Sequence, residues 1–295
     1  MRFLMPVIDL FPKDMRETLL SEIESFGTVP EEIRLRIGAP VCLRRYGREH
    51  LCSVTVKKEQ LLWIVGNAAE GSYHTAARYL RMGYLPLRYG SRVGVCGNGI
   101  DGKLASLGDV TSACIRIARS IVGCGGDIYE ELYRNGFCNT IIIAPPGAGK
   151  TTLLREMIRK LSYSGLYVGV ADERGEIAGM YGDKPTFDLG PRSDVLSGVP
   201  KSQGAMMLLR SMTPNVIAMD EITGDCDSEI VLEAANCGAG LLTTVHGEGE
   251  KVLYKPAFRT MRDLAVFQYA VVIDVSEKER KYRAVNLYDE GVWSN

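Results

Sequence analysis

Residues 140–152 read TIIIAPPGAGKTT, so that an apolar run leads directly into a Gly-rich segment ending in Lys-Thr-Thr. The β-branched run favours a strand, and the residues after Lys150 are typical of a helix. A strand, a Gly-rich loop and a helix in this order form a phosphate-binding loop, in which backbone N–H groups and the positive end of the helix dipole surround an anion. The sequence therefore predicts a nucleoside triphosphate site.

Individual residues of this loop have expected roles. Lys150 is expected to reach the β- and γ-phosphates of ATP, and the Thr151 hydroxyl to hold Mg²⁺. Ala144 stands where the usual pattern has a first Gly, and Ala can still take the extended conformation at the end of a strand. The residues predicted to bind the nucleotide are Pro145, Pro146, Gly147, Ala148, Gly149, Lys150, Thr151 and Thr152.

The composition is that of an ordinary globular protein, with 46% hydrophobic and 24% charged residues in a chain of 295, which leaves room for two domains. Eight cysteines without a Cys-x-x-Cys pair, and three histidines, indicate reduced thiols and give a zinc site little support. No run of 18 apolar residues occurs, and the N-terminus is too short and broken for a signal peptide. We expect a cytoplasmic protein that reaches a membrane only through partners and does not insert into it.

Charge is unevenly distributed along the chain. Residues 33–92 carry eleven Lys and Arg against three Asp and Glu, a balance of +8. Such a surface fits docking to an acidic partner, an anionic membrane or nucleic acid. A solvated face with ion pairs between subunits explains it equally well, and charge alone does not choose among these interpretations.

The second half of the chain alternates between strands and helices. The expected strands are 140–144, 166–171, 215–219, 240–245 and 269–275, and the expected helices are 150–163, 202–212 and 226–237. This alternation predicts a parallel sheet covered on both faces, with ligands at the carboxyl ends of the strands.

The first half has a different pattern, typical of a smaller α+β domain. Helices are expected at 12–26, 59–69 and 74–82, and strands at 33–37, 41–43, 88–95 and 112–118. The Gly-rich segment at 123–126 is the most linker-like part of the chain. We therefore expect an α+β docking domain at 1–125 and a P-loop domain at 126–295.

Polar residues follow three of the predicted parallel strands. Asp172-Glu173-Arg174 follows one, Asp220-Glu221 the next, and Thr243-Thr244-Val245-His246 closes the third. Because carboxylates are preferred Mg²⁺ ligands, Asp220 is predicted to hold the metal together with Thr151. Glu221 is placed to polarise a water for attack on the γ-phosphate, and Glu173 competes for that role.

Two further roles are less sharply defined by the sequence. A single His is more often structural, but the position of His246 on a strand beside the phosphate loop favours a role in sensing the γ-phosphate. Phosphoryl transfer also needs a cation on the developing charge, commonly an Arg from a neighbouring subunit. Spacing does not rank the candidates, which are Arg92, Arg116, Arg119, Arg192 and Arg210.

The order of these motifs resembles the secretion ATPases of type II and type IV systems and the pilus motors. More closely, the chain resembles the stage III sporulation AA family of endospore-forming Firmicutes. The matching stretches are Glu32–Arg36, Gly90–Gly97, Ile115–Arg119, Pro191–Leu196, Leu209–Pro214 and Thr243–Gly247. The departures are Ala144, and Gly90-Ser91-Arg92 where a His is expected before the Arg; neither changes the Lys, Thr or acid positions.

The resemblance implies a RecA-like ATPase that hydrolyses ATP with Mg²⁺ and works as a ring, expected to be hexameric. It also implies membrane-protein partners and a role in energising a channel between mother cell and forespore, from the mother-cell cytoplasm. In the secretion ATPases the front domain folds over the nucleotide site at the subunit boundary. A front-domain Arg is therefore expected there, with Arg116 preferred because its strand lies just before the linker.

Two alternatives to a secretion-type motor remain. One is a nucleic-acid-dependent ATPase, which the basic front half permits. The aromatic residues of this front half are not interleaved with basic ones in a stacking pattern, so nucleic acid is not the expected partner. The other is a slow ATP-binding switch, against which the paired acids Asp220 and Glu221 argue.

Overall fold

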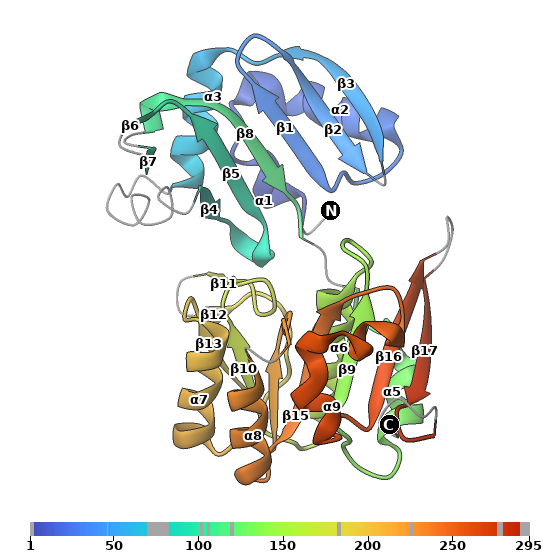
Figure 1. Ribbon diagram of the computed structural model, residues 1–295. Coiled ribbons are helices and arrows are strands. Elements are labelled where there is room, and N and C mark those ends of the chain that lie inside the picture. Colours follow the sequence, from blue (N-terminus) through green and yellow to red (C-terminus); the bar gives the residue numbers. More distant parts are fainter. Residues whose placement is uncertain are drawn as a thin grey trace. The chain divides into compact units, whose positions relative to one another are not determined.

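The computed structural model describes residues 3–45, 47–69, 83–100, 103–104, 107–118, 121–181, 184–224, 227–275 and 280–289 (Figure 1). The chain divides into two compact units. Unit 1 comprises Met1–Arg119 and Gly179–Thr186, and unit 2 comprises Ser120–Ala178 and Phe187–Asn295. The helix expected at 74–82 and the candidate Arg119 lie outside the described residues.

Unit 1 is an α+β unit built on a six-stranded antiparallel sheet with the order β3-β2-β1-β8-β5-β4 (Figure 1). Its elements are α1 (Met5–Ile8), α2 (Lys13–Phe26), β1 (Glu32–Arg36), β2 (Pro40–Arg45), β3 (Arg48–Thr55), α3 (Lys58–Ala68), β4 (Tyr84–Pro86), η1 (Arg88–Gly90), β5 (Arg92–Gly97), β6 (Gly99–Ile100), β7 (Lys103–Leu104), η2 (Leu107–Asp109), β8 (Val110–Arg116), β11 (Met180–Tyr181) and β12 (Lys184–Pro185).

The core of unit 1 follows from the apolar periodicity of these elements. In α2 the buried residues Met15, Leu19, Ile23 and Phe26 recur every three or four positions, so they share one face. In β1 Ile33 and Leu35 alternate with more exposed neighbours. Residues of α1, α2 and α3 join the sheet in one apolar cluster. The amphipathic helix expected at 12–26 is confirmed.

The strand expected at 88–95 begins later than predicted, at Arg92. Tyr89 and Gly90 have φ angles of 59° and 64°, in the left-handed region. Extended backbone does not pass through this region, so Arg88–Gly90 forms the 3₁₀ turn η1 instead of a strand.

Unit 2 contains a seven-stranded sheet with the order β13-β10-β14-β15-β9-β16-β17. Every neighbouring pair is parallel except β16 and β17. Its elements are α5 (Gly126–Tyr133), β9 (Thr140–Ala144), α6 (Lys150–Tyr163), β10 (Val168–Asp172), β13 (Ser193–Ser197), α7 (Lys201–Met212), β14 (Val216–Met219), α8 (Ser228–Asn236), β15 (Gly240–His246), η4 (Glu250–Tyr254), η5 (Pro256–Phe258), α9 (Arg259–Asp263), β16 (Tyr269–Val275) and β17 (Arg280–Asn286). The predicted α/β fold with a parallel sheet is confirmed.

Helices cover both faces of this sheet. Residues of α7, α8 and α9 share one apolar cluster with Ile141, Ile143 and Ile217 of the strands. Helix α6 packs against β9, β10 and β15, and its residues are absent from that cluster, which places it on the other face. All residues of β9, β10 and β14 are buried, as expected for the centre of a parallel sheet.

The strand order brings the predicted site motifs to one edge. Strands β10, β14, β15 and β9 are consecutive neighbours, so their carboxyl ends lie side by side. Ala171 is paired with Met219, and His246 with Ala144. The residues that follow these strands therefore meet around the Gly-rich loop.

Candidate nucleotide site

The loop between β9 and α6 has the backbone of an anion cradle. Gly147 and Gly149 have φ angles of 75° and 104°, a region that glycine enters without steric cost. A Cβ built on Gly147 would meet no atom within 4 Å, so the loop is open where a phosphate would approach. Ala144 is the last residue of β9, so its Cβ is accommodated as in any strand. These features fit a bound phosphate group.

Lys150, the first residue of α6, is folded back over this loop and is only 6% exposed. Its Nζ donates to the carbonyl oxygens of Ala144 and Pro145 at 2.9 and 3.2 Å, and it lies 2.7 Å from Nδ1 of His246. Burial lowers the pKa of Lys150, while Asp220 and Glu221 oppose this shift.

His246 connects Lys150 to Glu221. An ammonium group only donates, so Nδ1 of His246 must accept from Lys150. We therefore assign the ring hydrogen to Nε2, which lies 3.1 Å from Oε1 of Glu221. The three side chains form one chain of contacts from the loop to the predicted general base.

Asp220 is held by hydroxyl groups on both of its oxygens. Thr151 donates to Oδ2 at 2.7 Å, and Thr244 donates to Oδ1. A hydroxyl and a carboxylate in direct contact supply the hard oxygen donors that Mg²⁺ prefers. The structure thus brings together the two residues predicted to hold the metal.

Glu221 has a strained backbone with a φ of 53°, which costs a non-glycine residue about 1–2 kcal/mol. Its N–H donates to Oγ1 of Thr244 at 2.9 Å, and its carbonyl oxygen accepts from Nζ of Lys201. Its carboxylate lies between His246 and Arg174, with Arg174 NH1 at 3.3 Å. Strain of this kind persists only where the surroundings hold it, and it concentrates at functional sites.

The acidic segment after β10 divides into structural and site-facing residues. Asp172 is buried and accepts the N–H groups of Ile177 and Ala178 at 3.1 and 2.9 Å, closing the loop that follows. Burial raises the pKa of Asp172, against the lowering effect of these hydrogen bonds. Glu173 accepts the N–H of Lys201 at 3.2 Å, at the N-terminus of α7, where a carboxylate is favoured by the helix dipole.

A cavity of about 100 Å³ in unit 2 is lined by the acidic residues that follow β10 and β14. Its lining includes Glu173, Arg174, Lys201, Asp220 and Glu221. Both candidate bases therefore face the same space, next to the carboxylate predicted to hold the metal. Both residues line this cavity, but Glu221 also contacts His246 at 3.1 Å, and this contact favours Glu221 as the general base.

The candidate arginines lie in different places. Arg192 donates to the carbonyl of Ser162 at 3.3 Å, and Arg210 lies 3.9 Å from Glu233. Both therefore have partners within unit 2. Arg92 and Arg116 are paired neighbours on β5 and β8 of unit 1, where Arg116 ends its strand and is exposed.

One cation at the loop was missed by the sequence analysis. Arg280 of β17 places NH2 3.5 Å from the carbonyl oxygen of Gly147, and its guanidinium carbon 3.5 Å from a Cβ built on Gly149. A run of charged residues at the end of the chain resembles an ordinary solvated strand. β17 pairs with β16, and β16 pairs with β9, the strand that leads into the loop. This pairing brings Arg280 to the loop.

The parallel sheet, the glycine cradle and the contacts of Lys150, Thr151 and Asp220 define a P-loop nucleoside-triphosphatase fold of the RecA-like kind. The family of this chain and the proteins similar to it agree with this class. The chain belongs to the family described as Sporulation stage III, protein AA, whose model matches residues 6–292. It is 37% identical over 249 residues to Stage III sporulation protein AA of Bacillus subtilis (strain 168), covering 82% of this chain and 81% of that protein.

Solved structures show the same fold at lower identity. The Legionella pneumophila ATPase DotB is similar with a TM-score of 0.62 and 18% identity, covering 96% of this chain and 83% of that one. The pilus retraction motor PilT, solved with bound ADP, has a TM-score of 0.62 and 17% identity, covering 94% and 86%. Among the residues that the structure describes, no helix is both long and apolar enough to cross a membrane.

Proposed function

We propose that this protein is a Mg²⁺-dependent ATPase that acts as the motor of a secretion or channel complex during sporulation. The observation that carries the proposal is the continuous set of contacts from Lys150 through His246 to Glu221, beside the Thr151–Asp220 pair. Family membership supplies the link to sporulation. The fold shared with an ATPase and a pilus motor is the one expected for such work.

The residues divide the chemistry among themselves. Backbone N–H groups of the loop and the start of α6 bind the phosphates of ATP, and Lys150 exchanges its carbonyl partners for the β- and γ-phosphate oxygens. Thr151 and Asp220 would hold Mg²⁺, which would supply positive charge to neutralise the phosphates. Glu221 positions the attacking water, because it faces the cavity and is oriented by His246 and Arg174.

A complete site requires a second subunit in this proposal. The protein assembles as a ring, with a hexamer as the expected form, and Arg116 of one subunit contacts the γ-phosphate held by its neighbour. The exposed end of β8 leaves Arg116 available for such a contact. Hydrolysis then depends on assembly, as a motor needs.

The ring works at the cytoplasmic face of a membrane in the mother cell, held there by integral membrane proteins of the channel complex. The basic stretch at 33–92 supports docking of unit 1 onto an acidic protein surface. Direct insertion and nucleic-acid binding form no part of the proposal.

The proposal is tested by ATP turnover of the purified chain with Mg²⁺ and with EDTA, alone and with membranes from sporulating cells. Wild type should hydrolyse ATP only with Mg²⁺, and Lys150→Ala should not. A Glu221→Gln variant, which should keep ATP bound, is then used to capture partners from those cells. Recovery of nucleic acid in place of membrane proteins, or turnover that does not depend on Lys150, would count against the proposal.

A further inference from the structure

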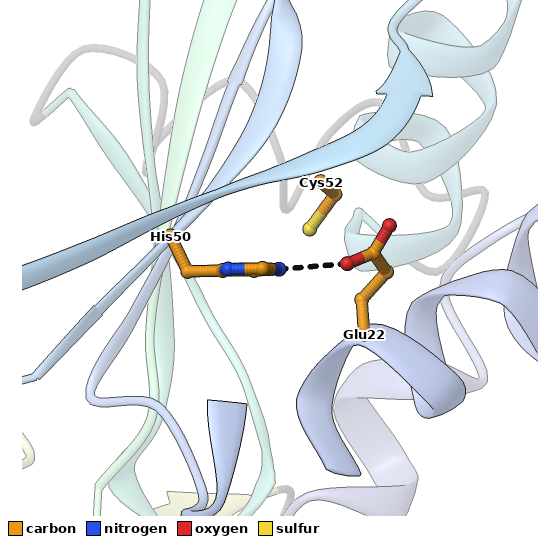
Figure 2. A group of neighbouring side chains, drawn as sticks. All are labelled: Glu22, His50 and Cys52. Carbon is orange, nitrogen blue, oxygen red and sulfur yellow. Dashed lines mark hydrogen bonds and ion pairs between the residues drawn. The ribbon is translucent and has the colours of Figure 1, made fainter. Parts of the chain in front are cut away.

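Unit 1 brings together three side chains of metal-ligating types, none of which belongs to the candidate nucleotide site. Glu22 comes from α2, and His50 and Cys52 come from β3 (Figure 2). One ligand atom from each, an oxygen, a nitrogen and a sulfur, lies within 4.8 Å of the other two. His50 and Cys52 are two residues apart on one strand, so they point to the same face of the sheet, the face on which Glu22 lies.

Ser53 fixes the orientation of the Glu22 carboxylate through one of its two oxygens. Oε1 accepts the N–H and the hydroxyl of Ser53, both at 2.7 Å. Ser53 lies in an irregular stretch of the edge strand β3: Pro40 pairs with Thr55 but Cys42 with Leu51, so three residues of β3 face one of β2. Such a bulge redirects side chains and frees backbone groups. Oε2 is left facing His50, whose Nε2 lies 2.7 Å away.

The Cys52 thiol gives independent support for a ligand site at this place. The residue is only 4% exposed, and among the described residues its Sγ has no hydrogen-bond partner. Figure 2 shows the sulfur directed toward the space between the His50 ring and the Glu22 carboxylate. An inward-facing thiol beside an imidazole and a carboxylate is the donor set of a borderline metal ion.

We propose that Glu22, His50 and Cys52 form a binding site for a divalent transition metal of the zinc class. Zinc binds oxygen and nitrogen at about 2.0–2.2 Å and sulfur at about 2.3 Å, which places tetrahedral ligand atoms roughly 3.5 Å apart. Separations from 2.7 Å up to 4.8 Å reach that geometry with movements of about 1 Å. The His50 and Glu22 side chains are 33% and 17% exposed, so water fills the fourth position and the metal has a path in.

Charge balance favours the same ion. One carboxylate and one thiolate neutralise a divalent cation, with His50 contributing a neutral nitrogen. Burial raises the pKa of the Cys52 thiol to about 12, so metal binding must release its proton. The sulfur donor selects against Mg²⁺ and Ca²⁺, which take oxygen ligands. The bound ion would tie α2 to the edge strand β3 and so stabilise unit 1.

Cobalt is the probe, because a cobalt–thiolate bond gives a near-ultraviolet charge-transfer band that no other ligand here produces. The full-length protein is stripped with EDTA, titrated with Co²⁺ under reducing conditions, and then challenged with Zn²⁺. Wild type should bind one Co²⁺ per chain with this band, and Zn²⁺ should remove it. Cys42→Ser is the matched control, since Cys42 is a buried cysteine on the adjacent strand, and it should behave like wild type.

Two variants decide between a metal site and a hydrogen-bonded pair. Cys52→Ser should lose the band, and His50→Gln, which retains an amide donor toward Glu22, should bind Zn²⁺ at least about tenfold more weakly. Zn²⁺ should raise the melting temperature of wild type and not of His50→Gln. The proposal is wrong if wild type binds no stoichiometric metal, or if the band or the Zn²⁺-dependent shift survives these substitutions. Should Cys52→Ser fail to fold, His50→Gln decides alone.

Discussion

Lys150 Nζ lies 2.7 Å from Nδ1 of His246, so the cation of the phosphate loop and the predicted sensor are in direct contact. The other ring nitrogen of His246 reaches Glu221. A γ-phosphate that draws Lys150 away from His246 therefore alters the environment of the general base in the proposed mechanism. Through these two contacts, His246 would transmit the presence of a γ-phosphate from Lys150 to Glu221.

The first prediction concerns nucleotide binding. Lys150→Ala removes a charge-assisted contact with phosphate, which is worth about 1.5–3 kcal/mol. ATP affinity should fall at least about tenfold in an equilibrium titration, while circular dichroism remains that of wild type. Lys160→Ala is the matched control, because Lys160 lies on the same helix and pairs with Glu130. Equal ATP affinity of wild type and Lys150→Ala would show that this loop does not bind the nucleotide.

The second prediction separates the two candidate bases. Glu221→Gln should bind Mg-ATP and hydrolyse it very slowly, because the amide keeps the shape and loses the base. Glu173→Gln should be milder, since an amide oxygen can still accept the N–H of Lys201. Single-turnover hydrolysis measures both variants. Wild-type rates in Glu221→Gln, with loss in Glu173→Gln, would transfer the role to Glu173.

A third prediction concerns Arg280, which lies against the phosphate loop. If it contributes to phosphate binding, Arg280→Gln should lower ATP affinity by about 1 kcal/mol, roughly fivefold, and reduce the salt dependence of binding. Arg283→Gln is the control, because Arg283 is on the same strand but pairs with Glu250 at 3.1 Å. Identical affinities of the two variants would make Arg280 a structural contact of the loop.

Local pattern was enough to predict the parallel sheet and the meeting of its polar strand ends. The strand at Thr140–Ala144 and the helix at Lys150–Tyr163 were predicted to the residue, because a glycine loop fixes where one ends and the other begins. Adjacent parallel strands then bring Asp220 and His246 to the loop without further information.

Long-range pairing was not predictable in the same way. Arg280 reaches the loop from a strand in which only Val285 is fully buried, so the sequence of this strand resembles that of a solvated one. The contact of Glu22 with His50 joins α2 to β3 across 28 residues, and no local pattern in either segment predicts that pairing. The left-handed backbone of Glu221 is likewise set by its contacts with Thr244 and Lys201, not by its own preference.

The last prediction concerns assembly. If Arg116 acts on the nucleotide of a neighbouring subunit, specific activity should rise with protein concentration, because hydrolysis needs an interface. Arg116→Ala and Lys150→Ala should each be inactive alone. A mixed ring contains some interfaces with an intact Lys150 on one side and an intact Arg116 on the other, so mixing should restore part of the activity. Arg210→Ala, whose guanidinium faces Glu233 in its own unit, should remain active alone. Absence of recovery in rings shown to contain both variants would exclude Arg116 as the residue supplied in trans.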